Sequence, residues 1–370
     1  MNKKGLFVLP TSEGGGGISS VAKSIAAYFN EKNIDVDFVF LNGVNDSDFQ
    51  GISEINTKFF LQKQNNKILH RIVVRHLFSQ FAKKHGSYDF VLAFGFLPAI
   101  LATRKFKNVV VTQHSSLYGA FPSYLSNYYL YQIKNSYPKA KAVITVSKEM
   151  ELQVNDFFKK EIAKTIYNPI DFEGITQQST GNVELNSEDY FLFVGRLDNN
   201  KQPMLIIKAF SDYLLREGQI KKLVLIGSGP LRDAVASEIE ELKLRDYVLL
   251  LGQIESPYSW MKSASALLLA SKFEGFGNVL VESLAVSTPV ISFNSPTGPN
   301  EIINSGEYRP EKNTSLSFSD NGILVNEFSE ADYSDALVAF DKMRQAFRPN
   351  ADFMIQDSLG KYLDLVINNE

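Results

Sequence analysis

The sequence predicts an α/β protein made of two Rossmann-like domains, each built on a parallel sheet. Its 370 residues leave room for two domains of ordinary size. Short apolar segments alternate with helical ones: residues 4–10 are strand-like and lead through a glycine-rich loop into a helix that ends near Phe29. A second strand-like opening, residues 190–195, follows a polar stretch at 173–189. We expect the domain boundary close to this stretch.

Composition is typical of a globular protein, with 44% apolar and 21% charged residues. The absence of cysteine excludes disulfides, thiolate zinc sites and a cysteine nucleophile, and it suits a cytosolic protein. The N-terminus has only a short apolar run before polar and glycine residues, which predicts a first strand rather than a signal peptide. The longest apolar run, residues 90–102, is too short to span a bilayer and predicts a strand that leads into a helix.

Charge is distributed unequally between the two halves of the chain. Residues 1–170 carry 21 Lys and Arg against 12 Asp and Glu, a net charge of +9, whereas the remainder carries 17 against 29, a net charge of −12. Between Glu54 and Glu149 the only acidic residue is Asp89. We therefore expect the first half to face an anionic partner.

Residues 67–85 are predicted to form a basic amphipathic helix. One interpretation is a surface helix with a solvated basic side. The other is docking to anionic lipid or to a lipid-diphosphate acceptor, on a surface extended by the aromatic residues of 118–131, which could equally pack into a core. The residues of this candidate membrane or acceptor face are Arg71, Arg75, Lys83, Lys84, Lys105 and Lys107.

Three further features lie in the first half. The glycine loop at 11–17 is either a phosphate contact or a tight turn, because it lacks the third glycine of a dinucleotide fingerprint. Asp35 and Asp37 form a D-x-D pattern, which we interpret as polar residues at a strand edge rather than a metal site. His114 follows a predicted strand at 108–112, and the carboxyl end of a strand is where α/β folds place ligands.

The most informative stretch is residues 271–299. Gly275 and Gly277 interrupt regular structure, and residues 278–286 predict a short buried helix that Asn278 would cap. A helix start with its free N–H groups suits an anion such as a diphosphate. Glu282 lies about one turn inside this helix and Glu274 precedes it. The alternative is a solvated loop acid and a helix acid that offsets the dipole.

Glu274 and Glu282, in EGFGNVLVE, resemble the E-x7-E motif of the retaining glycosyltransferases of family 4, which have the two-domain GT-B fold. The resemblance continues through residues 289–303, and further signatures recur along nearly the whole chain. It implies two Rossmann-like domains whose parallel sheets face each other across a cleft. No metal or other cofactor is expected for the donor, which would be a UDP-sugar.

The resemblance also implies a role for individual residues. Glu274 and His114 would position the sugar as the catalytic residues, Glu282 would bind the ribose, and residues near the nucleobase would be Gln253 and Ile254. Arg196 and Lys201 resemble the diphosphate-binding pair, whose cations offset charge on the leaving UDP. The implied donor-binding set is Gly16, Gly17, Arg196, Lys201, Gly277, Asn278, Val279 and Glu282.

We expect an acceptor-binding domain at residues 1–168, a nucleotide-sugar-binding domain at 169–350, and a C-terminal helix at 351–370 that crosses back to the first domain. The function that the resemblance implies is transfer of a hexose or N-acetylhexosamine to a saccharide, with a lipid-linked one favoured, in bacterial surface polysaccharide synthesis. The expected location is the cytoplasm, with peripheral attachment to the membrane. The rival functions are an NAD-dependent oxidoreductase and a non-catalytic nucleotide-sugar-binding protein.

Overall fold

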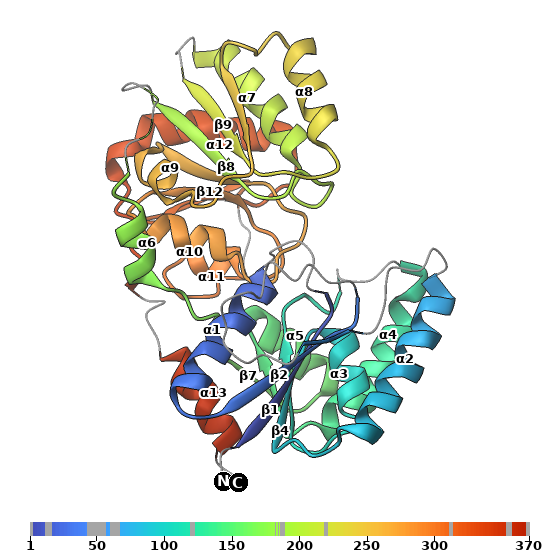
Figure 1. Cartoon of the computed structure of the whole chain (residues 1–370). Helices are drawn as coiled ribbons and strands as arrows, with labels where there is room; N and C mark the ends of the chain where they lie inside the picture. Colours follow the sequence, from blue (N-terminus) through green and yellow to red (C-terminus); the bar gives the residue numbers. More distant parts are fainter. Residues whose placement is uncertain are drawn as a thin grey trace. The chain divides into compact units, whose positions relative to one another are not determined.

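The computed structural model describes residues 3–11, 17–42, 57–59, 67–118, 123–181, 183, 185, 189–217, 221–310, 314–352 and 357–367. The chain divides into two compact units (Figure 1). The first unit comprises Met1–Pro169 together with Gln356–Glu370, and the second comprises Ile170–Ile355. The boundaries expected from the sequence fell after residues 168 and 350.

The first unit is built on a parallel sheet with the strand order β3-β2-β1-β4-β5-β6-β7. Its strands are β1 (Lys4–Leu9), β2 (Asp35–Phe40), β3 (Thr57–Phe59), β4 (Phe90–Phe94), β5 (Val109–Gln113), β6 (Ala142–Thr145) and β7 (Ala163–Thr165). Its helices are α1 (Gly17–Glu31), α2 (Lys67–Lys84), α3 (Phe96–Ala102), α4 (Ser123–Ser136), α5 (Lys148–Phe158) and α13 (Ser358–Ile367), with a 3₁₀ turn at Tyr137–Lys139.

Helices cover both faces of this sheet, which explains why its strands are almost continuously apolar. Residues of α2, α3, α4 and α5 pack on one face. Ile25 and Phe29 of α1 pack on the other face together with Tyr362 and Val366 of α13. The C-terminal helix therefore belongs to the first unit, next to α1 (Figure 1).

The second unit has the same strand order, β10-β9-β8-β11-β12-β14-β13, and only the edge strand β13 is antiparallel. Its strands are β8 (Tyr190–Val194), β9 (Lys222–Ile226), β10 (Val248–Gly252), β11 (Ala266–Leu269), β12 (Val290–Phe293), β13 (Leu316–Ser319) and β14 (Gly322–Val325). Its helices are α6 (Phe172–Gln178), α7 (Pro203–Glu217), α8 (Arg232–Glu241), α9 (Tyr258–Ser263), α10 (Asn278–Ala285), α11 (Pro299–Ile303) and α12 (Glu330–Met343), with a 3₁₀ turn at Arg344–Ala346.

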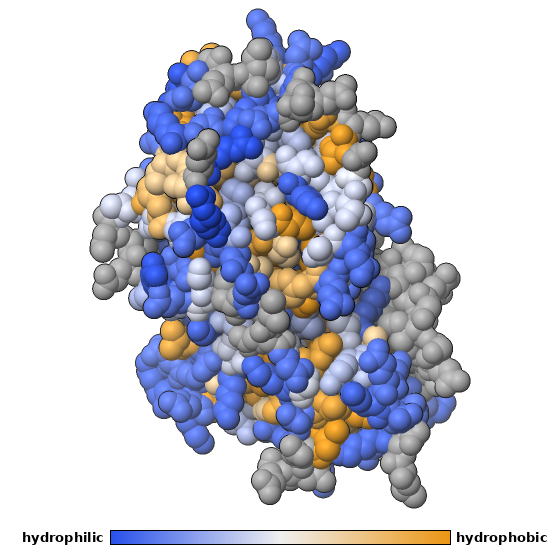
Figure 2. Space-filling model, turned by 90° about the vertical axis from the view of Figure 1, so that its left-hand side faces the viewer, coloured by the Kyte–Doolittle hydropathy of each residue, from blue (hydrophilic) through white to orange (hydrophobic). Residues whose placement is uncertain are grey.

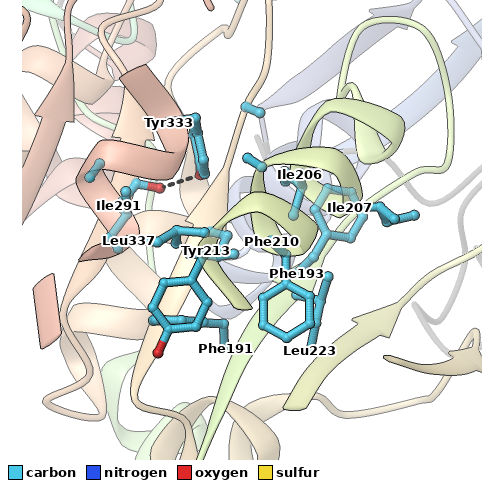
Figure 3. Packing of buried hydrophobic residues seen from close by; sticks show 14 of the residues in the cluster. Phe191, Phe193, Ile206, Ile207, Phe210, Tyr213, Leu223, Ile291, Tyr333 and Leu337 are labelled. Atoms are coloured by element: carbon cyan, nitrogen blue, oxygen red, sulfur yellow. Dashed lines mark hydrogen bonds between the residues drawn. The ribbon is translucent and has the colours of Figure 1, made fainter. Parts of the chain in front are cut away.

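The core of the second unit forms where α7 and α12 pack against the sheet (Figure 3). Phe191 and Tyr213 make an edge-to-face ring contact there, with centroids 5.5 Å apart. The buried hydroxyl of Tyr333 on α12 donates a hydrogen bond of 2.9 Å to the Ile291 carbonyl, so this polar group is satisfied within the core. The packed core of α7, α12 and the sheet thus supports the loops at the carboxyl edge of the sheet.

Three features of the structure were not expected from the sequence. The chain does not stay helical after α12: this helix ends at Met343, a 3₁₀ turn follows at Arg344–Ala346, and Phe347 is extended. The β13–β14 hairpin was not foreseen. Asp37, interpreted as a polar residue at a strand edge, is buried within β2, 3.1 Å from the Lys4 ammonium, and accepts a hydrogen bond of 2.6 Å from Tyr88.

Candidate active site

The candidate site of the second unit lies at the carboxyl ends of β8 and β11. Successive strands run outward from β8 in one direction through β9 and β10, and β11 then lies on the other side of β8. At such a reversal the loops after the two central strands diverge, and this is where open parallel sheets bind ligands. Here the two loops are residues 195–202, after β8, and 270–277, after β11.

Lys201 and Glu274 meet at this point. The Lys201 ammonium lies 2.6 Å from Oε1 of Glu274, and only 21% and 9% of the two side chains are exposed. The pair joins the two diverging loops through a charge-assisted hydrogen bond. The structure thus brings together a cation expected to bind phosphate and an acid expected to bind the sugar.

A network of hydrogen bonds holds the Lys201 loop in place. The Asp198 carboxylate accepts hydrogen bonds from the backbone N–H groups of Asn200 and Lys201, at 3.0 and 2.9 Å. The Asn200 side chain donates to the Phe273 carbonyl at 3.0 Å and accepts from the Phe273 N–H at 3.2 Å. The Asn200 carbonyl accepts from the Lys272 N–H at 2.8 Å. We call Asp198 and Asn200 the loop latch, because they fix one loop and tie it to the other.

Arg196 is more exposed than Lys201. Its side chain is 68% exposed, and its Nε lies 3.4 Å from the Asp198 carboxylate. Solvent screens a pair of this kind strongly, so Arg196 can exchange Asp198 for a ligand at little cost. Its position on the same loop as Lys201 keeps two cations at this end of the sheet.

The loop before α10 is stabilised by a neighbouring loop. Thr297 donates to the Gly275 carbonyl at 2.9 Å, and the Glu274 N–H donates to the Pro296 carbonyl at 2.9 Å. Gly298 approaches Phe276 so closely that a β-carbon there would lie 1.9 Å from the Phe276 carbonyl oxygen. Only glycine fits at this position, and the close contact sets the path of the chain into α10.

The helix α10 begins without a side-chain cap. The N-cap residue is Gly277, in the left-handed conformation with φ 96°, and Asn278 is the first helical residue. The prediction that Asn278 caps the helix was therefore wrong, since the positive φ favours glycine at the cap. Because Gly277 has no side chain, the N-cap residue offers no acceptor to the first N–H groups at Gly277–Val279, and a helix start of this kind suits an anion.

Glu282 lies one turn inside α10. Burial raises the pKa of this carboxyl to about 7, and the positive charge of Lys201 acts in the opposite direction. Tyr258, at the start of α9, has its pKa raised to about 12 by burial and by the negative charges of Glu282 and Asp171. Glu282 is therefore close enough to Lys201 to sense its charge, and its ionised form is poorly compensated by the protein.

His114 lies at the corresponding edge of the first unit, directly after β5. Its ring stacks on Phe94 with centroids 5.8 Å apart, and Nε2 lies 3.2 Å from the Thr112 hydroxyl. Burial lowers the pKa of His114 to about 4, so the ring is neutral near pH 7. A neutral imidazole of this kind positions a ligand through a hydrogen bond rather than by carrying a charge.

The structure says less about the roles of the other predicted site residues. Gly17 is the first residue of α1, and Gly16 lies outside the described residues. Gln253 is exposed after β10, where its side-chain oxygen accepts a hydrogen bond of 3.2 Å from Ser228. Ile254, which follows it, is half-buried. These contacts leave the nucleobase prediction untested.

The candidate membrane or acceptor face does not form one cluster. Arg75 lies in the first half of α2 and donates a hydrogen bond of 2.5 Å to Tyr128 of α4. Lys83 and Lys84 end that helix, about 12 Å further along its axis. Lys105 and Lys107 lie near the same end, in the turn before β5. The side chain of Arg71 lies outside the described residues.

Neither a metal cluster nor a membrane-spanning helix is found in the described part of the chain. No three His, Asp or Glu side chains among the described residues gather as a metal-binding group. None of the described helices is both long and apolar enough to cross a bilayer. The face shown in Figure 2 is largely hydrophilic, with hydrophobic residues in separate patches.

The loop latch was not predicted from the sequence. Asp198 and Asn200 follow a strand end in the series RLDNNK, and side chains of Asp and Asn commonly bond to backbone groups two or three residues on. That turn chemistry was the available signal for Asp198. The partner of Asn200 lies 73 positions along the chain, at Phe273, and no local pattern indicates it.

Two family models together match most of the chain. Residues 176–352 match the model of the glycosyl transferases group 1, and residues 15–173 match that of Glycosyltransferase Family 4. A relative from Campylobacter jejuni, N-acetylgalactosamine-N,N'-diacetylbacillosaminyl-diphospho-undecaprenol 4-alpha-N-acetylgalactosaminyltransferase, is 34% identical over 58% of this chain and 55% of its own length. The chain spans about half the length of the curated relatives it matches, at 55%, 50% and 45% for three of them.

Solved structures show the same fold over nearly the whole chain. The apo form of the lipopolysaccharide outer core galactosyltransferase WaaB is 20% identical, with a TM-score of 0.67 over 98% of this chain and 99% of that chain. HepE of Anabaena, solved in complex with UDP, is 16% identical, with a TM-score of 0.70 over 98% of this chain and 96% of that chain. With both halves matched by family models and the fold shared throughout, the chain belongs to the family 4 glycosyltransferases with the GT-B fold.

Proposed function

We propose that the protein transfers a sugar from a UDP-sugar to a hydroxyl of a saccharide acceptor, with retention of the anomeric configuration. The observation that carries this proposal is the Lys201–Glu274 pair at the strand reversal of the second unit, beside the uncapped start of α10. A cation, a helix start and two acids are the groups that a nucleotide diphosphate joined to a sugar requires.

The diphosphate would bind to Lys201, Arg196 and the helix start at Gly277–Val279. These groups place positive charge where the leaving UDP gains negative charge, and electrostatic stabilisation of this kind supplies most of the rate enhancement in many enzymes. Because two cations of the loop after β8 already supply this charge, we propose that the donor needs no metal ion. UDP bound to HepE, a protein of the same fold, supports a uridine nucleotide.

Glu282 would accept hydrogen bonds from the two ribose hydroxyls. In the free protein its ionised form is disfavoured, which is why its pKa is raised to about 7. A diol donates two hydrogen bonds to a carboxylate and would compensate that burial. Donor binding should therefore favour the ionised form of Glu282.

Glu274 and His114 would orient the transferred sugar. The Glu274 carboxylate is paired with Lys201, and the neutral His114 ring stacks on Phe94. Each therefore presents a hydrogen-bonding group in a fixed position. We propose that the leaving phosphate itself takes the proton of the acceptor hydroxyl as the new bond forms on the same face of the sugar. In this scheme the protein contributes position and charge rather than a nucleophile.

The acceptor is proposed to be a lipid-linked saccharide of bacterial surface polysaccharide, such as lipopolysaccharide or capsule. The Campylobacter jejuni relative supports this through the diphospho-undecaprenol in its name, and it favours a hexose or N-acetylhexosamine as the transferred sugar. A cytoplasmic enzyme attached peripherally to the inner face of the membrane would meet both substrates. The positive net charge of residues 1–170 agrees with an anionic partner on that side.

A thermal-shift screen tests the donor class. UDP, GDP, ADP, CMP and NAD are compared on the wild type and on two variants, Glu282→Ala and the matched surface variant Glu241→Ala. Ligand at 100 times its dissociation constant adds about 2.7 kcal/mol of stability. We expect UDP to stabilise the wild type and the Glu241 variant but not the Glu282 variant.

Stabilisation by NAD alone would restore the oxidoreductase alternative and overturn the proposal. Stabilisation by UDP without any sugar transfer, tested with a panel of UDP-sugars and lipid-linked acceptors, would favour a non-catalytic nucleotide-sugar-binding protein.

A further inference from the structure

Both cations of the proposed diphosphate site are paired with an acid of the protein itself. The Lys201 ammonium lies 2.6 Å from Oε1 of Glu274, and Nε of Arg196 lies 3.4 Å from the Asp198 carboxylate. Each acid thus occupies the cation that a phosphate oxygen would use. A diphosphate that binds to these two cations has to compete with both carboxylates.

The two acids differ in the partners that they keep when a ligand takes their cation. The Asp198 carboxylate also accepts hydrogen bonds from the backbone N–H groups of Asn200 and Lys201, at 3.0 and 2.9 Å, so it stays compensated without Arg196. The Glu274 side chain is only 9% exposed, and within the described residues its carboxylate has no hydrogen-bond partner besides Lys201. A buried carboxylate without a partner is costly, so Glu274 competes strongly for its cation.

The pair of Lys201 and Glu274 is not needed to hold its two loops. The backbone N–H of Lys201 donates to Asp198, and the backbone N–H of Glu274 donates to the Pro296 carbonyl at 2.9 Å. The loop latch joins the two loops through other hydrogen bonds. Because a lysine ammonium is carried on a flexible stem, it can turn from the acid to a ligand while the backbone stays in place. The geometry therefore suits an exchange of partners.

A sugar on the diphosphate would give Glu274 a new partner. Sugar hydroxyls donate hydrogen bonds, and an ionised carboxylate has two oxygens that accept them. UDP lacks the transferred sugar, so it takes the ammonium from Glu274 and offers this acid no donor in return. Binding of UDP should therefore leave a buried acid uncompensated, whereas binding of a UDP-sugar should not.

We propose that Glu274 competes with the diphosphate for Lys201 and thereby favours release of the product UDP. While the sugar is in place, its hydroxyls satisfy Glu274 and the ammonium stays on the diphosphate. Once the sugar has passed to the acceptor, Glu274 loses these donors and takes back the ammonium, which weakens the binding of UDP. This inference rests on the proposed donor and adds a role for Glu274 after the transfer.

In the alternative arrangement, Glu274 holds the Lys201 ammonium in position for a diphosphate that contacts it at the same time. A lysine ammonium has three N–H donors, so it can serve two anions at once. The two arrangements predict opposite effects of removing the Glu274 charge. Loss of a holding group weakens UDP binding, whereas loss of a competitor strengthens it. A variant that is merely damaged in structure also binds less tightly, so tighter binding is specific to competition.

The test is isothermal calorimetry with UDP and with the UDP derivatives of glucose, galactose, N-acetylglucosamine and N-acetylgalactosamine. Glu274→Gln removes the charge and keeps the shape of the side chain. The matched control is Glu238→Gln, because Glu238 also pairs with a lysine of the second unit, Lys208, at 3.6 Å. We expect Glu274→Gln to bind UDP about tenfold more tightly than the wild type and the control do, mainly through slower dissociation, which surface plasmon resonance measures. We also expect the UDP-sugar that the wild type prefers to lose its advantage over UDP in this variant.

Equal or weaker UDP binding by Glu274→Gln would overturn the inference, and so would an unchanged preference for the UDP-sugar over UDP. Inorganic pyrophosphate is the second probe, because it tests the competition without a nucleoside or a sugar. If the wild type binds neither UDP nor any UDP-sugar, but Glu274→Gln binds pyrophosphate about tenfold more tightly than the wild type does, the proposed donor fails and the competition stands. Pyrophosphate binding that is equal or absent in all three proteins would overturn the competition itself.

Discussion

The two units share a strand order but differ in the side chains at the carboxyl edges of their sheets. In the second unit, Lys201 and Glu274 meet at the carboxyl edge, at the strand reversal. In the first unit the same edge carries the neutral ring of His114. The same framework thus supports a pair of charged groups in one unit and a neutral polar group in the other.

The difference also concerns how each group is held. Lys201 is mostly buried, its backbone is fixed by Asp198, and its ammonium is paired. His114 is also buried, but its ring stacks on Phe94 and its Nε2 lies near the uncharged hydroxyl of Thr112. A charge that is paired within the protein can be exchanged for a charged ligand, whereas a neutral ring orients a ligand by hydrogen bonding alone.

Removing Lys201 should have the largest effect on the charged site of the second unit. Lys201→Ala takes away the buried cation and leaves Glu274 as an uncompensated acid, so we expect the transfer rate to fall by about 10²- to 10³-fold. Lys208→Ala is the matched control, since Lys208 is an exposed lysine of α7 that pairs with Glu238 at 3.6 Å. Initial rates of sugar transfer check this, and equal activity of the two variants would contradict it.

Lowering the pH should destabilise the first unit, because the buried His114 is neutral in the folded protein. Its folded-state pKa of about 4 lies below its ordinary value near 6.5, so the unfolded chain binds a proton more readily. Stability is therefore fully present above about pH 6.5 and is lost as the pH falls toward 4, by about 3 kcal/mol from this group. Denaturant unfolding at several pH values measures the loss, and His114→Gln should remove this part of it.

Substitutions in the loop latch should displace the Lys201 side chain without removing its charge. Asp198→Ala removes the acceptor of two backbone N–H groups, and Asn200→Ala removes two hydrogen bonds to Phe273. Because small misplacements of a positioning group reduce rate strongly, we expect kcat to fall by about thirtyfold in each variant while UDP affinity changes little. A loss confined to UDP affinity would show that these residues act on binding alone.

The pH dependence of UDP binding should show whether Glu282 binds the ribose in its ionised form. If the ribose binds to the ionised carboxylate, whose pKa is raised to about 7, affinity rises by about tenfold between pH 6 and pH 8 and then levels off. Isothermal calorimetry across this range tests the prediction. In Glu282→Gln the affinity should be lower and nearly independent of pH.

Much of the fold followed from the sequence, for physical reasons that are local. Apolar strand segments alternate with helices, and the domain class, the strands around 190–195 and the helix after Gly277 were confirmed. The C-terminal helix was expected to cross back, and α13 does pack on α1. The end of α12 at Met343 and the turn that follows it were not expected from the sequence.

The site was only partly predictable, because its geometry depends on contacts between distant segments. The sequence identified Lys201, Glu274 and Glu282 as separate candidates, but it gave no sign that Lys201 would pair with Glu274. The burial of Asp37 beside Lys4 was likewise set by strand pairing and not by local pattern. Gly277 was not expected as the N-cap residue, because asparagine, which follows it at position 278, is itself a preferred N-cap residue.

A crystal structure with UDP bound would show directly which groups hold the diphosphate and the ribose. We predict that the diphosphate lies within hydrogen-bonding distance of the Lys201 ammonium and of the backbone N–H groups at Gly277–Val279, with both ribose hydroxyls on Glu282. A diphosphate bound instead at the start of α1 in the first unit, with Lys201 still paired to Glu274 and Glu282 without a ligand, would contradict the account.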